Sequence, residues 1–181
     1  MMRIALLSFM IILVLVLWTG CATSISPEMA DLLVDKVDLT RYSGLWYQVA
    51  RYPHSFQRGE CGDSTAEYSL REDGKINVIN RCWEGEYGGT YSQQVRAVGT
   101  AMDERGSWLR VVFFKVFPAA YLIIELDEEN YQWAAVTTAN KGSLWILSRT
   151  PALDEKTFEQ ILLSLEAKGF TRDKIIRTSQ Q

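Results

Sequence analysis

Two stretches decide the fold of this chain, GLWY at residues 44–47 and LWILSRTP at residues 144–151. Between them, short runs of alternating apolar and polar residues are separated by turn residues. This spacing is typical of all-β barrels and sandwiches, and it makes the first stretch an opening strand and the second a closing strand.

The same pattern predicts eight strands. They are expected at Leu45–Tyr52, Ser64–Leu70, Lys75–Arg81, Gln93–Ala101, Trp108–Phe114, Tyr121–Leu126, Tyr131–Thr137 and Leu144–Arg149. Most connections after the first are short, for example Glu72-Asp73-Gly74, so neighbouring strands must be antiparallel. We therefore expect an all-β fold, an eight-stranded antiparallel up-and-down barrel that leaves no free sheet edge.

One helix is expected after the barrel, packed against its outside. Asp154 is a suitable N-cap, and Gly169 stands where a helix ends. The apolar residues between them share one helical face, namely Phe158, Ile161, Leu162 and Leu165. Residues Lys174 to Arg177 are a candidate for a short ninth strand.

The N-terminus has the layout of an export signal. A basic start is followed by an apolar run over residues 4–18 and by Thr19-Gly20-Cys21, which resembles a bacterial lipobox. The resemblance implies a signal peptide over 1–20, acylation of Cys21, a tether over 21–37 and a domain over 38–178. Ala22, rather than Asp, after the cysteine implies the outer membrane, with the barrel facing the periplasm. An unmodified thiol in a signal-anchor is the alternative.

Composition and motifs argue against several classes of function. The net charge is −3 and basic residues form no cluster, so we expect no nucleic-acid partner. His54 is the only histidine, and no metal-ligand spacing or phosphate loop occurs, so we expect no enzyme, metal or cofactor. Cys61 and Cys82 lie almost symmetrically about the Glu72–Gly74 turn, which predicts a disulfide in an exported protein.

The two deciding stretches together resemble the lipocalin family. Further similarity through Tyr68-Ser69-Leu70 and residues 78–81 extends the match over 38–174, and the pattern is most similar to bacterial outer-membrane and apolipoprotein D-like members. The resemblance implies that Trp46 closes the barrel floor and that Arg149 lies across its ring. Of the middle family motif only Asp127 remains.

Strand alternation indicates which residues line the interior. With Trp46 inside, Tyr52 is expected inside and Arg51 outside, while Arg110 on the outer face turns Phe113 inward. The sixth strand is apolar on both faces and cannot be oriented. The resemblance and the alternation together give a ligand-binding set, which is Tyr52, Tyr68, Asn80, Phe113, Trp145 and Leu147.

The implied function is to bind, store or transport a fatty acid or lysophospholipid inside the barrel. One alternative is a structural or interaction lipoprotein with a filled barrel. Two others are an integral outer-membrane barrel, which outward arginines disfavour, and an isomerase-like or de-epoxidase-like lipocalin enzyme. The oligomeric state stays open, and a homodimer is one possibility.

Overall fold

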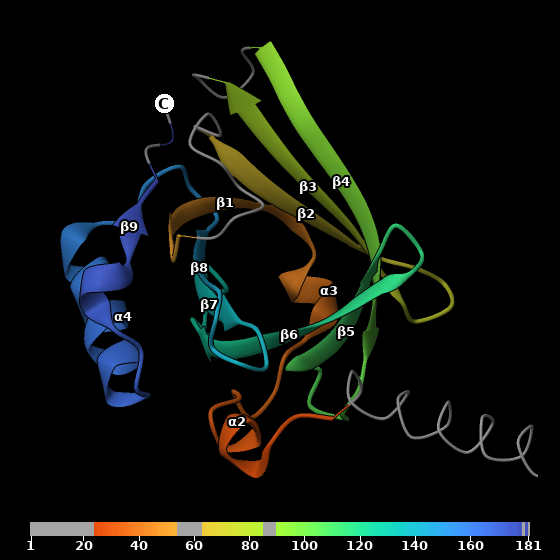
Figure 1. Ribbon diagram of the computed structural model, residues 1–181, viewed down its shortest axis with the longest axis horizontal. Coiled ribbons are helices and arrows are strands. Elements are labelled where there is room, and N and C mark those ends of the chain that lie inside the picture. The colour runs from red at the N-terminus through yellow and green to blue at the C-terminus, as the bar shows by residue number, and fades with distance from the viewer. Residues whose placement is uncertain (1–23, 54–62, 85–89, 179, 181) are drawn as a thin grey trace, which may run out of the picture.

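The computed structural model describes residues 24–53, 63–84, 90–178 and 180, and within them nine strands form one sheet (Figure 1). The sheet order is β2-β3-β4-β5-β6-β7-β8-β1-β9, and β2 also pairs with β1, which closes the barrel. The predicted eight-stranded antiparallel barrel is confirmed. The strands are β1 (Gly44–Arg51), β2 (Ser64–Leu70), β3 (Ile76–Glu84), β4 (Thr90–Ala101), β5 (Trp108–Phe113), β6 (Phe117–Leu126), β7 (Trp133–Thr137), β8 (Leu144–Ser148) and β9 (Ile176–Arg177).

Four strand boundaries differ from the prediction by two residues or more. β3 continues to Glu84 and β4 begins at Thr90, each three residues beyond the expected boundary, because these two residues still pair. β6 begins at Phe117, before the expected Tyr121, because β5 and β6 form a tight hairpin in which Phe113 pairs with Phe117. β7 begins at Trp133, after the expected Tyr131, because Tyr131 has a φ of 56° and belongs to the preceding turn.

The barrel has two distinct ends because its strands alternate in direction. Trp46 near the start of β1 and Arg149 just after β8 mark one end, which we call the floor. The β1–β2, β3–β4, β5–β6 and β7–β8 connections lie at the opposite end, which we call the mouth.

Two hydrophobic cores lie on the two sides of the barrel wall. The inner core surrounds Trp46, while the outer core lies between the wall and helix α4 (Glu155–Ala167). The four apolar residues predicted for the helix face are all buried in this outer core. Asp154 caps the helix by accepting a bond from the Thr157 amide at 3.0 Å, and Gly169 has a φ of +82°. The predicted external helix is therefore confirmed.

The C-terminal segment returns from α4 to the sheet. A 3-10 turn, η1 (Arg172–Lys174), leads into β9, which pairs with β1 through Ala50 and Arg177. The candidate ninth strand therefore forms, although only over two residues. No helix in the described ranges combines the length and apolar character needed to cross a membrane.

The segment before the barrel is packed rather than a free tether from Pro27 onward. Helix α2 (Pro27–Asp31) begins after the N-cap Ser26 and buries Met29, and Leu33 lies in the same outer core. Val37 is also buried, and its amide donates to the Arg105 carbonyl at 2.7 Å. Our expected tether over 21–37 is thus too long, because Met29 and Leu33 are buried against the outer face of the barrel.

Candidate functional site

The floor of the barrel is closed by Arg149 and Trp46, which is the arrangement that the resemblance to lipocalins implies. The guanidinium carbon of Arg149 lies 3.8 Å from the centre of the Trp46 ring. Its nitrogens donate to four backbone carbonyls, those of Leu45 (2.9 Å), Arg41 (2.7 Å), Ser43 (3.0 Å) and Tyr131 (3.2 Å). One side chain thereby joins β1, the segment before it and the β6–β7 turn. Desolvation by these neighbours lowers the pKa of Arg149 from its ordinary value.

Gly44 makes room for this arrangement. A Cβ at this position would lie 3.2 Å from Nη1 of Arg149, and the backbone has a φ of +104°. Both features exclude a larger residue without a shift of the guanidinium. Trp46 is fully buried and donates from Nε1 to the Tyr42 carbonyl at 2.8 Å. The glycine and the tryptophan of the GLWY stretch therefore serve the same closure.

A second Arg–aromatic contact secures the loops beneath the floor. Helix α3 (Leu39–Tyr42) places Arg41 over the Tyr131 ring at 4.1 Å. The β6–β7 turn that carries Tyr131 is ordered by Asp127, whose carboxylate accepts bonds from the amides of Asn130 and Gln132, both at 3.2 Å. Asp127, the surviving residue of the middle family motif, therefore shapes the turn that Arg149 and Arg41 both contact.

Three tyrosines form a hydrogen-bonded cluster inside the barrel. The Tyr121 hydroxyl lies 2.7 Å from that of Tyr42 and 2.9 Å from that of Tyr68. The Tyr42 ring also packs on Trp46 with ring centres 5.0 Å apart. Burial raises the pKa of Tyr68 to about 12 and that of Tyr42 and Tyr121 well above the ordinary value. The three phenols therefore stay neutral and can hydrogen-bond to one another.

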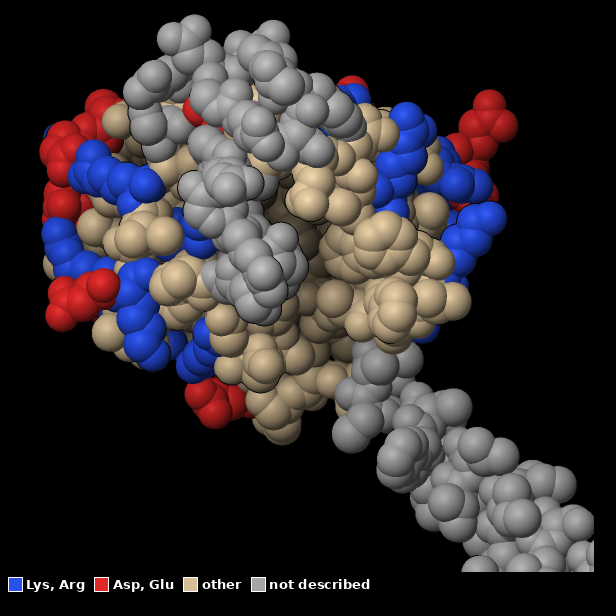
Figure 2. All heavy atoms as spheres, turned by 45° about the horizontal axis from the view of Figure 1, so that its top comes forward, with Lys and Arg blue, Asp and Glu red and all other residues tan. Residues whose placement is uncertain are grey.

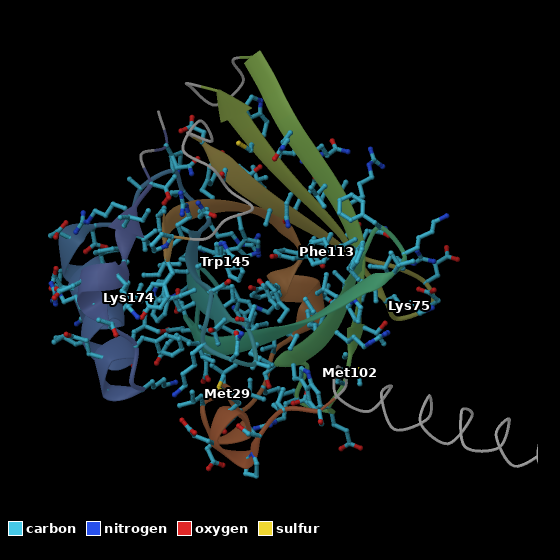
Figure 3. The ribbon with its side chains drawn as sticks, viewed as in Figure 1. Met29, Lys75, Met102, Phe113, Trp145 and Lys174 are labelled. Carbon is cyan, nitrogen blue, oxygen red and sulfur yellow. The ribbon has the colours of Figure 1, made fainter. Side chains whose placement is uncertain are left out.

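The interior is filled near the floor but open to solvent nearer the mouth. Tyr68 and Leu147 are 4% and 3% exposed. Phe113 and Trp145 pack against the same inner core but remain partly exposed, and they approach the interior from different walls (Figure 3). Asn80, which pairs with Ala66 of the inner core, is also partly exposed. Because these side chains face inward and are still in contact with solvent, the interior beside them is not filled by other side chains.

The space-filling view agrees with this interpretation. Figure 2 shows a hollow on the face turned forward, and the described residues beside it are mainly uncharged. Five of the six residues of the predicted ligand-binding set therefore lie on the inner side of the wall, and three of these are in its open part.

Tyr52 is the exception, and its predicted position in the pocket is wrong. A β-bulge in β1 between Gln48 and Ala50 shifts the register against β8, so that Ala50 and Tyr52 join the outer core. The Tyr52 ring packs on Phe170 with centres 6.3 Å apart, and its hydroxyl accepts a bond from the Thr171 amide at 2.6 Å. Tyr52 therefore holds the segment after α4 against the wall.

The same bulge turns Arg51 toward the interior, which also corrects our expectation. Arg51 pairs with Trp145, an inner-face residue, and cross-strand partners share one face of a sheet. Its side chain is partly buried and makes no ion pair within the part of the chain that the structure describes. Desolvation lowers its pKa from the ordinary value. Arg51, whose Nη1 donates to the Tyr52 carbonyl at 3.2 Å, thus lies near the mouth beside Trp145 and has no acidic partner among the described residues.

The structure also orients the sixth strand. Tyr121 and Ile123 belong to the inner core and Leu122 and Ile124 to the outer core. A bulge between Ile123 and Glu125 then turns Leu126 inward again. Both faces of β6 are apolar because one lines the barrel and the other lies in the outer core. Sequence reasoning missed Tyr121 for this reason.

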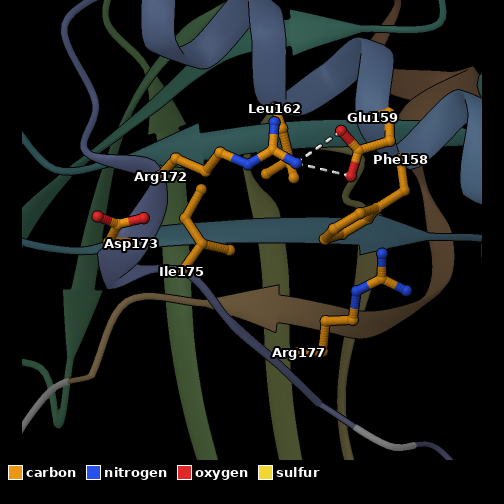
Figure 4. A pocket seen from close by; sticks show the side chains of 7 residues that line it. All are labelled: Phe158, Glu159, Leu162, Arg172, Asp173, Ile175 and Arg177. Carbon is orange, nitrogen blue, oxygen red and sulfur yellow. Dashed lines mark hydrogen bonds and ion pairs between the residues drawn. The ribbon is translucent and has the colours of Figure 1, made fainter.

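Other sites are less suited to an apolar ligand. A shallow cleft of about 300 Å³ lies outside the barrel between α4, η1 and β9 (Figure 4). Its arginines are already paired, Arg172 with Glu159 at 2.6 Å and Arg177 with Glu155 at 2.5 Å. No group of three or more His, Cys, Asp or Glu suited to a metal occurs in the described residues. Cys21, His54 and Cys61 lie outside the described residues.

Comparison with known proteins identifies the family. The model of the "lipocalin-like domain" matches residues 37–180. The chain belongs to the lipocalin family. It is 38% identical over 174 residues to the outer membrane lipoprotein Blc of Vibrio cholerae, covering 94% of this chain and 97% of the relative. Identity to Blc of Escherichia coli K12 is 37%, covering 87% and 88%, and to mouse apolipoprotein D 32%, covering 81% and 78%.

Solved lipocalin structures show the same fold. Apocrustacyanin C2 superposes with a TM-score of 0.66 at 19% sequence identity and covers 87% of this chain and 88% of its own. Lobster apocrustacyanin A1 gives a TM-score of 0.65 at 20% identity, covering 90% and 89%. The predicted family and barrel are therefore confirmed.

We expect Arg149→Lys to lower the free energy of unfolding by about 2–4 kcal/mol. Lysine keeps the charge but cannot reach four carbonyls from one plane above the indole, and each charged hydrogen bond contributes about 1.5–3 kcal/mol. Arg81→Lys is the matched control, because Arg81 makes one surface ion pair, with Glu67, and should cost less than about 1 kcal/mol. Urea unfolding measures both, and equal losses would contradict the role of Arg149.

The tyrosine cluster predicts a loss of stability at alkaline pH. An unfolded phenol ionises near 10, whereas burial raises the pKa of Tyr68 to about 12 and that of Tyr42 and Tyr121 well above the ordinary value. Above pH 10 the unfolded state therefore releases protons that the folded state keeps, and stability falls as pH rises through this window. Urea midpoints between pH 8 and 12 should decline more steeply for the native sequence than for Tyr68→Phe. Identical slopes would contradict a neutral buried cluster.

Proposed function

We propose that this lipocalin is a lipid-anchored outer-membrane lipoprotein that binds fatty acids or lysophospholipids inside its barrel. The observation that carries the proposal is the partial exposure of the inward-facing Phe113 and Trp145. Apolar surface that stays in contact with water is energetically unfavourable. An apolar chain that packs against these two rings would remove their surface from water and so be bound favourably. The rival hypothesis of a barrel filled by its own side chains requires these residues to be covered.

Arg51 supports an anionic head group for the ligand. A partly buried cation without an acidic partner in the described residues is stabilised when an anion approaches it. A fatty acid presents a carboxylate and a lysophospholipid a phosphate, and each carries a single long hydrocarbon chain. We infer that the head group lies at the mouth beside Arg51 and that the chain extends toward Phe113 and Tyr68. This is a binding role and needs no catalytic group.

The anchor and the membrane rest on sequence and on relatives. Proteins 37–38% identical to this chain are named outer membrane lipoproteins. Cys21 lies five residues before Ser26, where the packed structure begins, so an acylated Cys21 would hold the domain within about 18 Å of the membrane. Glu28 on α2 pairs with Lys141 of the β7–β8 connection at 3.0 Å, which supports our inference that the anchored end of the domain lies on the side that carries the mouth.

Binding can be tested with head-group and wall variants of residues 24–181, which include the whole sheet and both cores. In competition with a fluorescent fatty acid, Arg51→Gln should weaken binding of palmitate about tenfold and leave hexadecanol unchanged, because only the carboxylate pairs with arginine. Trp145→Ala should weaken the binding of both palmitate and hexadecanol about fivefold or more. Trp133→Ala removes a partly buried indole from the outer core and should change neither affinity.

Two results would contradict this proposal. The native protein would show no saturable binding, or Arg51→Gln would weaken acid and alcohol equally. Thermal unfolding of each variant separates lost binding from lost structure.

Acylation and the disulfide can be tested together. Cys82 is buried on β3 opposite Ser64, three residues after Cys61, and we propose that the two cysteines are bonded. Intact mass of the protein purified from bacterial membranes should equal residues 21–181 plus acyl groups, with no alkylation by iodoacetamide in denaturant before reduction and two sites after it. A mass that still includes residues 1–20 would refute processing and acylation at Cys21. Alkylation before reduction would refute the disulfide.

A further inference from the structure

The hairpin between β5 and β6 carries a cluster of exposed apolar side chains at the mouth. Phe114, Val116 and Phe117 are 67%, 66% and 66% exposed, and they account for half of the large exposed hydrophobic residues within the described ranges. Lys115 lies among them at the tip of the turn. We call residues 114–117 the apolar tip. Exposed apolar clusters of this kind mark interaction sites.

The turn of this hairpin contains residues that are unfavourable for the stability of the fold. Phe114 and Lys115 have φ values of 51° and 65°, and the Val116 amide donates to the Phe113 carbonyl at 3.0 Å. A β-turn with positive φ at both central residues prefers Asn-Gly, since other residues lose about 1–2 kcal/mol each in this conformation. The chain therefore holds a phenylalanine and a lysine outward at a position where stability favours neither.

The charge of the hairpin indicates the partner. The hairpin over residues 108–126 contains Arg110, Lys115 and one acidic residue, Glu125, which lies toward the floor end of β6 and pairs with Lys168 at 2.9 Å. The mouth end of the hairpin therefore carries Lys115 and no Asp or Glu, although the whole chain has a net charge of −3. Aromatic side chains with an adjacent cation match the boundary between the acyl chains and the anionic head groups of a bilayer. The β5–β6 connection also lies at the same end of the barrel as the β7–β8 connection. Lys141 of the β7–β8 connection forms an ion pair with Glu28 of α2.

We propose that the apolar tip inserts into an anionic lipid surface and holds the barrel mouth against it. This inference rests on the proposed function, because a ligand drawn from the bilayer would then pass into the barrel without crossing water. The head groups of the surface would pair with Lys115, and the three apolar side chains would lie among the upper acyl segments. The docking is separate from the anchor and would occur without Cys21.

The test measures flotation of residues 24–181 with vesicles of phosphatidylethanolamine and phosphatidylglycerol. The double variant Phe114→Asp with Phe117→Asp should lower the apparent affinity for these vesicles at least tenfold. Two apolar side chains are then replaced by carboxylates, which the anionic head groups repel. Leu163→Asp is the matched control: Leu163 is 61% exposed on α4, away from the tip, and its variant should bind as the native protein does.

A second variant guards against loss of structure. Phe114→Asn with Lys115→Gly places the preferred residues in the turn, so it should raise the melting temperature by a few degrees while weakening vesicle binding. A variant that is more stable yet binds vesicles less confirms that the tip is kept for docking. Unchanged vesicle binding in this variant would overturn the proposal.

Palmitate binding in vesicle-free solution separates this inference from the proposed function. Native protein that binds palmitate but not vesicles would overturn docking and leave the ligand site intact. Sedimentation velocity tests the other occupant of an apolar surface. The proposal is wrong if the native protein is a dimer that does not bind vesicles and if the double variant Phe114→Asp with Phe117→Asp is a monomer. The apolar tip would then contact a second copy of the chain.

Discussion

The contact between Arg149 and Trp46 is the constraint on which the rest of the structure depends. A barrel with two open ends would admit water throughout, and its apolar interior would contribute little to folding or to binding. The guanidinium solves this at one end because it covers the indole and donates to four backbone carbonyls. An apolar cap could not satisfy those carbonyls, and an ammonium group could not reach them from one position.

The closed floor lets the wall carry a core on each side. Near the floor, Trp46 and the tyrosine cluster fill the interior, while toward the mouth partly exposed aromatic residues leave it open. The outer core lies between α4 and the part of the wall formed mainly by β1, β6, β7 and β8. This part of the wall is therefore packed from the outside, so its stability does not depend on a filled interior.

Much of this architecture could be predicted from the sequence, and the errors have local causes. Alternation along each strand and the caps of α4 are short-range signals, so the strands and the helix were predictable. The pair Trp46–Arg149 followed from the resemblance to lipocalins, because no local pattern links residues so far apart in the sequence. The bulge in β1 leaves no such signal, because it depends on the register against β8, and it reverses the faces of Tyr52 and Arg51. Tyr121 was hidden because both faces of β6 are apolar. Helices α2 and α3 are too short for a periodic pattern.

The central claim is that a closed floor creates an apolar interior that holds an acyl chain, with its head group at Arg51. The most direct measurement is a crystal structure of residues 24–181 grown with palmitate brominated at its terminal carbon, with the bromine located by its anomalous signal. The account predicts bromine density inside the barrel, on the floor side of Trp145, and the carboxylate beside Arg51. Bromine in the cleft between α4 and η1, on the outer surface or nowhere in the protein would contradict it.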